Sequence, residues 1–222
     1  MKTNILLSTI ISLAVIEFGC GTQSPIANTN SNMAMNSNAS NMPMNDSKMQ
    51  GVNNGNMDHS MMQSSPNVAS APYDLQFLDT MAAHHQGAVD MAGPCSAKAQ
   101  HAEVKTLCAN IISSQQKEIA EMKTWRDKWF AGAAPAINME MMGMNDSMKG
   151  MDMKMLGSLK GSEFDLAFIK QMIPHHEGAV TMAKEALQKS TKPEIKTLAG
   201  TIIKAQEAEI KQMKEWQTAW SK

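Results

Sequence analysis

Two pairs of adjacent histidines draw attention because each pair lies between methionines in an otherwise apolar segment. Residues 81–92 read MAAHHQGAVDMA, and residues 172–183 read MIPHHEGAVTMA. Imidazole nitrogen and thioether sulfur both bind metal ions, and the soft thioether favours Cu(I) and Ag(I) over Zn, Mg or Ca. The two segments therefore predict metal ligands in each half of the chain. The candidates are Met81, His84, His85, Met91, Met172, His175, His176 and Met182.

Methionine is also abundant outside these segments, since the chain contains 23 methionines. Eight lie between Met33 and Met62 and eight between Met139 and Met155, among Asn, Ser, Gly and Asp residues. Methionine often fills gaps in a core, but these polar surroundings predict no core to fill. Closely spaced thioethers can instead converge on a soft ion and, unlike thiolates, form no disulfides in an oxidising compartment. The further candidates are Met57, His59, Met61, Met62, Met139, Met141, Met142, Met144, Met148, Met151, Met153 and Met155.

The elements that would position these side chains occur twice, at a constant offset of 91 residues. Residues 74–129 and 165–220 are identical at 25 of 56 positions, which chance does not produce. Apolar residues recur every three and four positions, which is typical of amphipathic helices. Gly93-Pro94 predicts the end of the first helix, and the pattern from Thr191 to Glu194 predicts a capping box at the start of the last one.

These signals predict an all-α fold, a four-helix bundle built from two tandem helical hairpins. The four helices are expected at about 74–92, 101–129, 163–189 and 192–220. Residues 21–72 lack any helical or strand period and are expected to be a disordered Asn/Ser/Met-rich segment. The predicted organisation is a signal peptide (1–20), this segment (21–72) and the bundle (73–222), which comprises repeat one (74–130), a flexible Met-rich crossover (131–162) and repeat two (163–220).

The helical wheel places both histidines of each pair beside the buried stripe of their helix. Folding the first hairpin antiparallel brings Glu118 and Met122 within about one helical turn of Met81 and His85. Glu209 and Met213 are the equivalent residues of repeat two. Buried imidazole and carboxylate groups are costly unless they are paired or coordinated. Two interpretations stay open, a His–Glu network that only sets helix register and a metal site that includes Glu118, Met122, Glu209 and Met213.

Several other classes of protein are disfavoured by the sequence. The Glu-x-x-His motif of di-iron carboxylate bundles is absent, and Met81-x-x-His84 stands where it would be expected. We find no His-Glu-x-x-His motif, nucleophile elbow or Gly-rich phosphate loop. The net charge of -1 provides no basic field for nucleic acid. Catalytic residues are therefore not predicted.

The repeated segments FLDTMAAHHQGAVDMA and FIKQMIPHHEGAVTMA, followed by IISSQQKEIAEMKTW and IIKAQEAEIKQMKEW, resemble a known family. It is the exported, ferritin-like family known as domain of unknown function 305, which has a copper-binding member. The resemblance covers residues 74–130 and 163–220. It implies a helical bundle and a role in periplasmic or extracellular copper binding and tolerance. Carried over to matching positions, it points to the same methionines and histidines of the two repeated segments.

We therefore expect a non-enzymatic protein of the cell envelope that sequesters or transfers Cu(I), and also Ag(I), through Met and His ligands. Imidazole would allow Cu(II) to bind as well. The expected partners are metal ions and a copper exporter or another envelope copper protein. The alternative is a copper- or haem-dependent bundle oxidoreductase with Met and His axial ligands, although the Cys-x-x-Cys-His motif of covalent haem is absent.

The N-terminus and the cysteines indicate an exported protein. Residues 1–16 have a basic start and an apolar run that is too short to span a bilayer, as in a signal peptide. Cys20 is a candidate for lipid attachment, with simple cleavage nearby as the alternative; a lipid anchor would be the protein's only contact with a membrane. Cys95 and Cys108 flank the turn of the first hairpin, so they either form a disulfide or remain free thiols.

Overall fold

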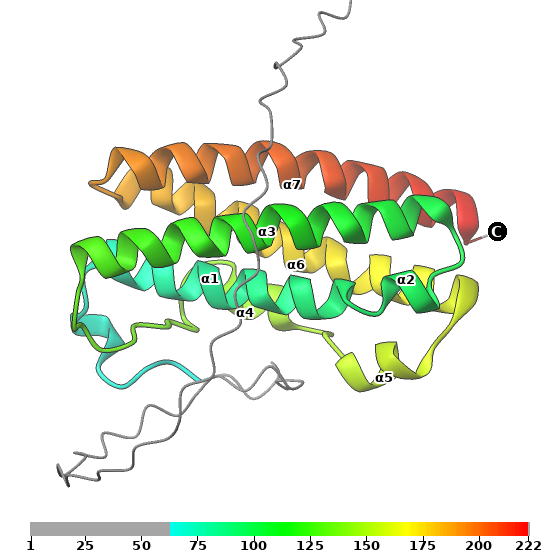
Figure 1. Cartoon of the computed structure of the whole chain (residues 1–222), viewed down its shortest axis with the longest axis horizontal. Coiled ribbons are helices and arrows are strands. Elements are labelled where there is room, and N and C mark those ends of the chain that lie inside the picture. The colour runs from blue at the N-terminus through cyan, green and yellow to red at the C-terminus, as the bar shows by residue number, and fades with distance from the viewer. Residues whose placement is uncertain (1–62, 222) are drawn as a thin grey trace, which may run out of the picture. The chain divides into compact units, whose positions relative to one another are not determined.

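The computed structural model describes residues 63–221, and its regular elements are all helices. The all-α prediction is confirmed, and every long helix begins and ends within two residues of its predicted bounds. The long helices are α1 (Tyr73–Ala92), α3 (Ala102–Trp129), α6 (Gly161–Lys189) and α7 (Pro193–Trp220) (Figure 1). The short ones are η2 (Val68–Ser70), α2 (Cys95–Lys98), α4 (Met144–Met148) and α5 (Met153–Ser158).

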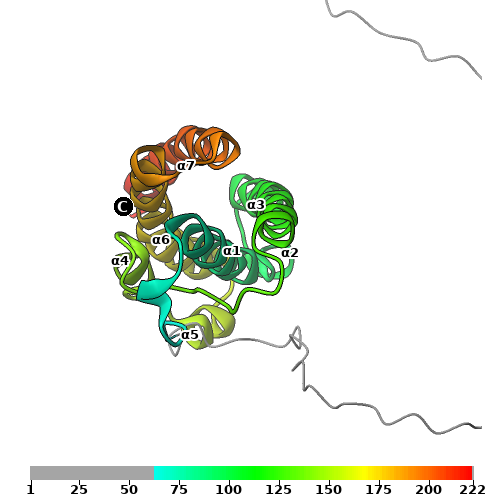
Figure 2. The same ribbon diagram turned by 90° about the vertical axis from the view of Figure 1, so that its left-hand side faces the viewer.

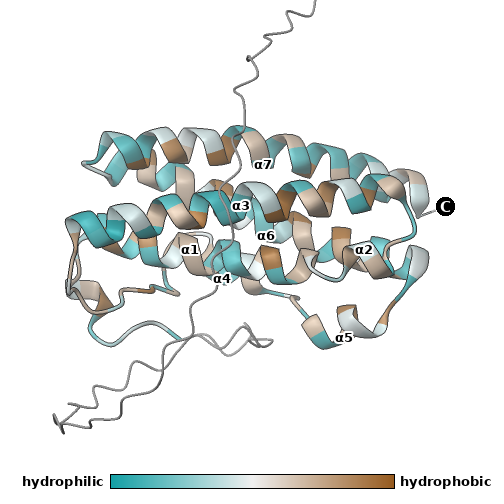
Figure 3. Cartoon of the chain, viewed as in Figure 1, coloured by the Kyte–Doolittle hydropathy of each residue, from teal (hydrophilic) through white to brown (hydrophobic). Residues whose placement is uncertain are grey.

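The long helices form two antiparallel hairpins that meet through their first helices. Helix α1 packs against α3, α6 packs against α7, and α1 packs against α6. In the end-on view, α1 and α6 lie side by side where the hairpins meet, and α3 and α7 lie on the same side of them (Figure 2). Brown apolar residues alternate with teal polar ones along each helix, as expected for amphipathic helices (Figure 3).

The core consists of two clusters, and each cluster contains methionines of both repeats. Each cluster contains three buried methionines from the two repeats, two from one repeat and one from the other. The first methionine set is Met81, Met122 and Met182, and the second methionine set is Met172, Met213 and Met91. The offset of 91 residues converts the first set into the second. The same sulfur-rich arrangement is therefore built twice, once on each side of the contact between α1 and α6.

The crossover between the hairpins folds back onto the bundle, so the prediction of a flexible segment is wrong. Met139, Met141 and Met144 are 9%, 5% and 0% exposed and belong to the same core cluster as the first methionine set. Helix α4 packs on α6 at Gly178, where an added Cβ would overlap Ser147 and the carbonyl oxygen of Gly143. The glycine that follows the second histidine pair thus leaves room for this close approach.

Polar side chains of α1 anchor the crossover, which explains why its polar composition was misleading. Asp79 accepts a hydrogen bond from the backbone of Ala136 at 2.8 Å, and Thr80 accepts one from the backbone of Asn138 at 2.9 Å. Because these bonds satisfy backbone groups near the bundle, the neighbouring methionines can be buried. The premise that these methionines had no core to fill does not hold for the buried ones.

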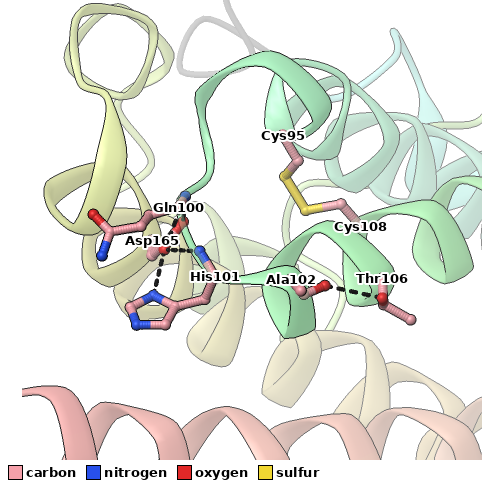
Figure 4. Close-up of a disulfide and its surroundings, with 7 residues drawn as sticks. All are labelled: Cys95, Gln100, His101, Ala102, Thr106, Cys108 and Asp165. Atoms are coloured by element: carbon pink, nitrogen blue, oxygen red, sulfur yellow. Dashed lines mark hydrogen bonds and ion pairs between the residues drawn. A yellow bond between two sulfur atoms is a disulfide. The ribbon is translucent and has the colours of Figure 1, made fainter.

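The capping box predicted for α7 is also wrong. Thr191 Oγ1 donates to Asp74 Oδ2 of the other hairpin at 2.9 Å, and no side chain caps α7. Asp165, which lies 91 residues after Asp74, likewise binds the turn of the opposite hairpin. It accepts hydrogen bonds from the backbone of His101 at 2.9 Å and of Gln100 at 3.1 Å (Figure 4). Each hairpin turn is thus tied to the other repeat through a tertiary contact.

Cys95 of α2 and Cys108 of α3 form a disulfide that closes the first hairpin (Figure 4). Repeat two has Ala186 and Ala199 at these positions, so alanine is compatible with the same helix packing. Changing both cysteines to alanine should lower the free energy of unfolding by about 3 kcal/mol, because the unfolded chain is no longer constrained by the bridge. Denaturant titration without reductant measures this loss. Equal midpoints for the two proteins would contradict the prediction.

Candidate metal centre

The four histidines lie buried where α1 packs against α6, and two of them join the repeats. All four are at most 1% exposed. The rings of His84 and His175 lie face to face at a tilt of 35°, with their centroids 3.8 Å apart. The sequence predicted ligands within each half of the chain and did not predict this contact. The internal repeat was the available signal, because two like hairpins packed about a two-fold axis bring equivalent residues together at that axis.

The other two histidines each bind a glutamate of the neighbouring helix, as the antiparallel hairpin predicted. His85 Nε2 lies 2.7 Å from Glu118 Oε2, and His176 Nε2 lies 2.8 Å from Glu209 Oε2. The glutamate side chains are 13% and 20% exposed, whereas both imidazoles are fully buried. Each carboxylate therefore reaches from the surface of the bundle to a buried ring.

This contact determines which ring nitrogen carries the proton in the neutral imidazole. An ionised carboxylate only accepts hydrogen bonds, so Nε2 must donate and Nδ1 keeps an unprotonated lone pair. The Nδ1 atoms of His85 and His176 are buried and have no hydrogen-bond partner among the described residues. An unsatisfied buried polar atom costs about 1–3 kcal/mol. Both nitrogens are therefore suited to binding a metal ion.

The surrounding donors determine which metal ion would fit. Among residues 63–221, no group of three or more His, Cys, Asp or Glu side chains could hold a metal. A site at His85 therefore needs other donors, and the nearby thioethers are the candidates. Met81 lies one helical turn before His85, and Met122 lies one turn after Glu118. Nitrogen together with sulfur suits Cu(I) or Ag(I) better than Zn(II) or Mg(II).

The sequence matches one protein family over most of its length. Residues 22–126 and residues 74–217 each match the sequence model of the family described as Domain of unknown function (DUF305). The chain belongs to the DUF305 family. This confirms the resemblance found in the repeated segments. No curated protein is significantly similar to this chain.

Solved structures with the same fold include metal-bound forms of the protein CopM. The Cu(II)-bound form is 44% identical, with 66% of this chain and 97% of CopM aligned and a TM-score of 0.58. The Cu(I)-bound and co-crystallised Ag-bound forms are both 43% identical, with 66% and 96% aligned and TM-scores of 0.57. A DUF305 protein from Streptomyces coelicolor, described as a candidate secreted protein, is 31% identical, with 68% and 94% aligned and a TM-score of 0.60.

In this DUF305 chain, the two methionines of each repeated segment are too far apart to share an ion. Met81 and Met91 are ten residues apart, which is about 15 Å along an α-helix, and they belong to different core clusters. The same holds for Met172 and Met182. The two methionines of one segment would therefore belong to different sites, and the role of all four as ligands stays a prediction. Each histidine–glutamate pair lies about one helical turn from two methionines of its own hairpin, and the core cluster of those methionines also contains one methionine of the other repeat.

The remaining candidates of this DUF305 protein divide by position. Met142 and Met155 are 63% and 42% exposed, and Met148, Met151 and Met153 are partly buried. Their role as ligands stays a prediction. The other candidates, Met57, His59, Met61 and Met62, lie outside the described residues. The predicted signal peptide, Cys20 and the Asn/Ser/Met-rich segment up to residue 62 also lie outside them. None of the described helices is long and apolar enough to cross a membrane.

Proposed function

We propose that this DUF305 protein binds copper as its cargo in the cell envelope and catalyses no reaction. The observation that carries the proposal is the buried, unpartnered Nδ1 of His85 and of His176, each on a ring held by a glutamate. Histidines that bind metals commonly donate their other N–H to a carboxylate in this way. The similarity to CopM, whose structures contain Cu(II), Cu(I) and Ag, supports the choice of metal.

The proposed ligands form two sites related by the internal repeat. The first combines His85 Nδ1 with thioethers of the first methionine set, and the second combines His176 Nδ1 with thioethers of the second methionine set. His84 and His175, whose rings contact each other, are further candidates. In this proposal Glu118 and Glu209 orient the imidazoles rather than bind the ion, because each already accepts a hydrogen bond from a ring nitrogen.

Such sites would let the protein lower the concentration of free copper outside the cytoplasm. Neutral thioethers hold Cu(I) and Ag(I), and imidazole also accepts Cu(II), so both oxidation states of copper have donors. We propose that the bound ion is stored or passed to a copper exporter or another envelope copper protein, which would contribute to copper tolerance. Secretion, and lipid attachment at Cys20, belong to the same proposal.

Metal selectivity tests the proposal directly. Under reducing conditions the protein should bind Cu(I) more tightly than Zn(II), because Zn(II) sites favour thiolate, imidazole and carboxylate over thioether. Competition with a chromogenic Cu(I) chelator, with and without excess Zn(II), measures the difference. Displacement of Cu(I) by an equal concentration of Zn(II) would refute the assignment. Oxygen consumption by the copper-loaded protein would instead favour the oxidoreductase alternative.

A further inference from the structure

A groove of about 520 Å³ runs between α3 and α7. In the end-on view, α3 and α7 lie on the same side of α1 and α6 (Figure 2), so the groove lies outside the contact between α1 and α6. Its α3 wall includes Glu118, Glu121 and Trp125, and its α7 wall includes Glu194, Leu198 and Thr201. The groove is not used by the copper ligands proposed above.

Glu118 connects this groove to the buried histidines. Its side chain lines the groove, and its Oε2 lies 2.7 Å from Nε2 of the fully buried His85. A single side chain therefore separates the groove from an imidazole whose Nδ1 has no hydrogen-bond partner among the described residues. An ion in the groove would be one residue away from the first proposed site.

The charge of the groove favours cations. Glu118, Glu121 and Glu194 line it, and Lys117 is the one residue of opposite charge among the described residues that line it. A groove lined mainly by one sign of charge raises the local concentration of the opposite ion and can raise association rates by about 10- to 1,000-fold. These carboxylates are not grouped so as to hold a metal within residues 63–221. They would therefore attract an ion without retaining it.

Repeat two does not reproduce this lining. Lys117 and Glu121 correspond to Ala208 and Gln212 at the offset of 91 residues. These two charged side chains are thus specific to the half of the molecule that contains the first histidine–glutamate pair. The comparison also shows that glutamine is compatible with this position of the outer helix, which makes Glu121→Gln a conservative change.

We propose that a soft monovalent cation, Cu(I) or Ag(I), reaches His85 through the groove between α3 and α7 and passes Glu118 on the way. This inference rests on the proposed function, because it requires a cargo site at the histidines. On arrival the ion exchanges a ligand from solution for the lone pair of Nδ1. No proton is displaced from the neutral imidazole, because its Nδ1 carries none when its Nε2 donates to Glu118.

Ag(I) uptake followed through the imidazole NMR signals tests the route, since Ag(I) is diamagnetic and matches the softness of Cu(I). One variant, Glu121→Gln/Glu194→Gln, removes charge from the groove, and Thr201→Trp fills it from an exposed position of α7. The control, Glu140→Gln/Glu215→Gln, makes the same change in net charge at exposed positions outside the groove.

At low ionic strength both groove variants should take up Ag(I) at His85 about tenfold more slowly than the wild type, and the control should match the wild type. The final signal positions should be the same in all four proteins. Equal rates throughout would overturn the route while leaving the proposed site intact, and so would a control that slows as much as the charge variant. If Ag(I) leaves the His85 and His176 signals of the wild type unshifted at equilibrium, the proposed function itself fails.

Discussion

Cu(I) binding at the first site is expected to weaken about a hundredfold, or by about 2.7 kcal/mol, when the first methionine set is changed to leucine. Leucine has nearly the volume of methionine, and such swaps in a core usually cost less than about 1.5 kcal/mol each. The triple variant Met81→Leu/Met122→Leu/Met182→Leu should therefore stay folded while losing its thioether donors. If these methionines only fill the core, the affinity should hardly change.

The second site provides an internal control for this experiment. In the triple variant, one-equivalent additions of Ag(I) should still shift the imidazole signals of His176, because the second methionine set is intact. The signals of His85 should move only at much higher Ag(I) concentration. Circular dichroism checks that the helical content is retained. If the imidazole signals of both histidines shift at the Ag(I) concentrations that suffice in the wild type, the first methionine set contributes packing but no ligand.

The stabilisation that Cu(I) gives the bundle is expected to disappear in the variant His85→Gln/His176→Gln. The glutamine amide can still donate a hydrogen bond to Glu118 or Glu209, but it lacks the nitrogen lone pair of Nδ1. In the wild type, free Cu(I) at a thousand times the Kd should stabilise the folded state by about 4 kcal/mol for each of the two proposed sites. For a chain of this length that corresponds to a rise in Tm of roughly 10 °C for each occupied site.

Thermal melting of both proteins, apo and with Cu(I), separates the two interpretations of the buried histidines. If they are ligands, the apo variant should melt near the apo wild type, and only the wild type should gain from Cu(I). If they form a structural network alone, the variant should be less stable than the wild type with and without metal. Any rise in Tm caused by Cu(I) should then be equal in the two proteins. Copper that binds the folded and the unfolded chain equally well does not change the Tm and so does not affect this comparison.

The features that depend on short stretches of sequence were predicted well. Helix bounds follow from local periodicity and breaking residues, so the expected helices agree with α1, α3, α6 and α7. The contact between His85 and Glu118 also follows from the sequence, because a short turn fixes the register of an antiparallel hairpin. The repeat at an offset of 91 residues then predicts the equivalent contact between His176 and Glu209.

The features that depend on how the hairpins pack could not be predicted in this way. No periodicity within one hairpin encodes which residues of the other hairpin it contacts, so the contact between His84 and His175 was not predicted. For the same reason, the sequence did not predict that each core cluster contains methionines of both repeats. The capping box failed because Thr191 found its partner in Asp74, which lies 117 residues earlier in the chain.

The sequence by itself determined the donor types, the helices that hold them and the twofold repetition, because residue identity and helical period are local properties. The tertiary structure decided which donors lie near one another, and it buried Met139, Met141 and Met144 of a crossover whose composition suggested exposure. It also left the groove between α3 and α7. These outcomes depend on packing between segments distant in the chain, where side-chain volume and tertiary hydrogen bonds, rather than local pattern, determine which arrangement has the lowest free energy.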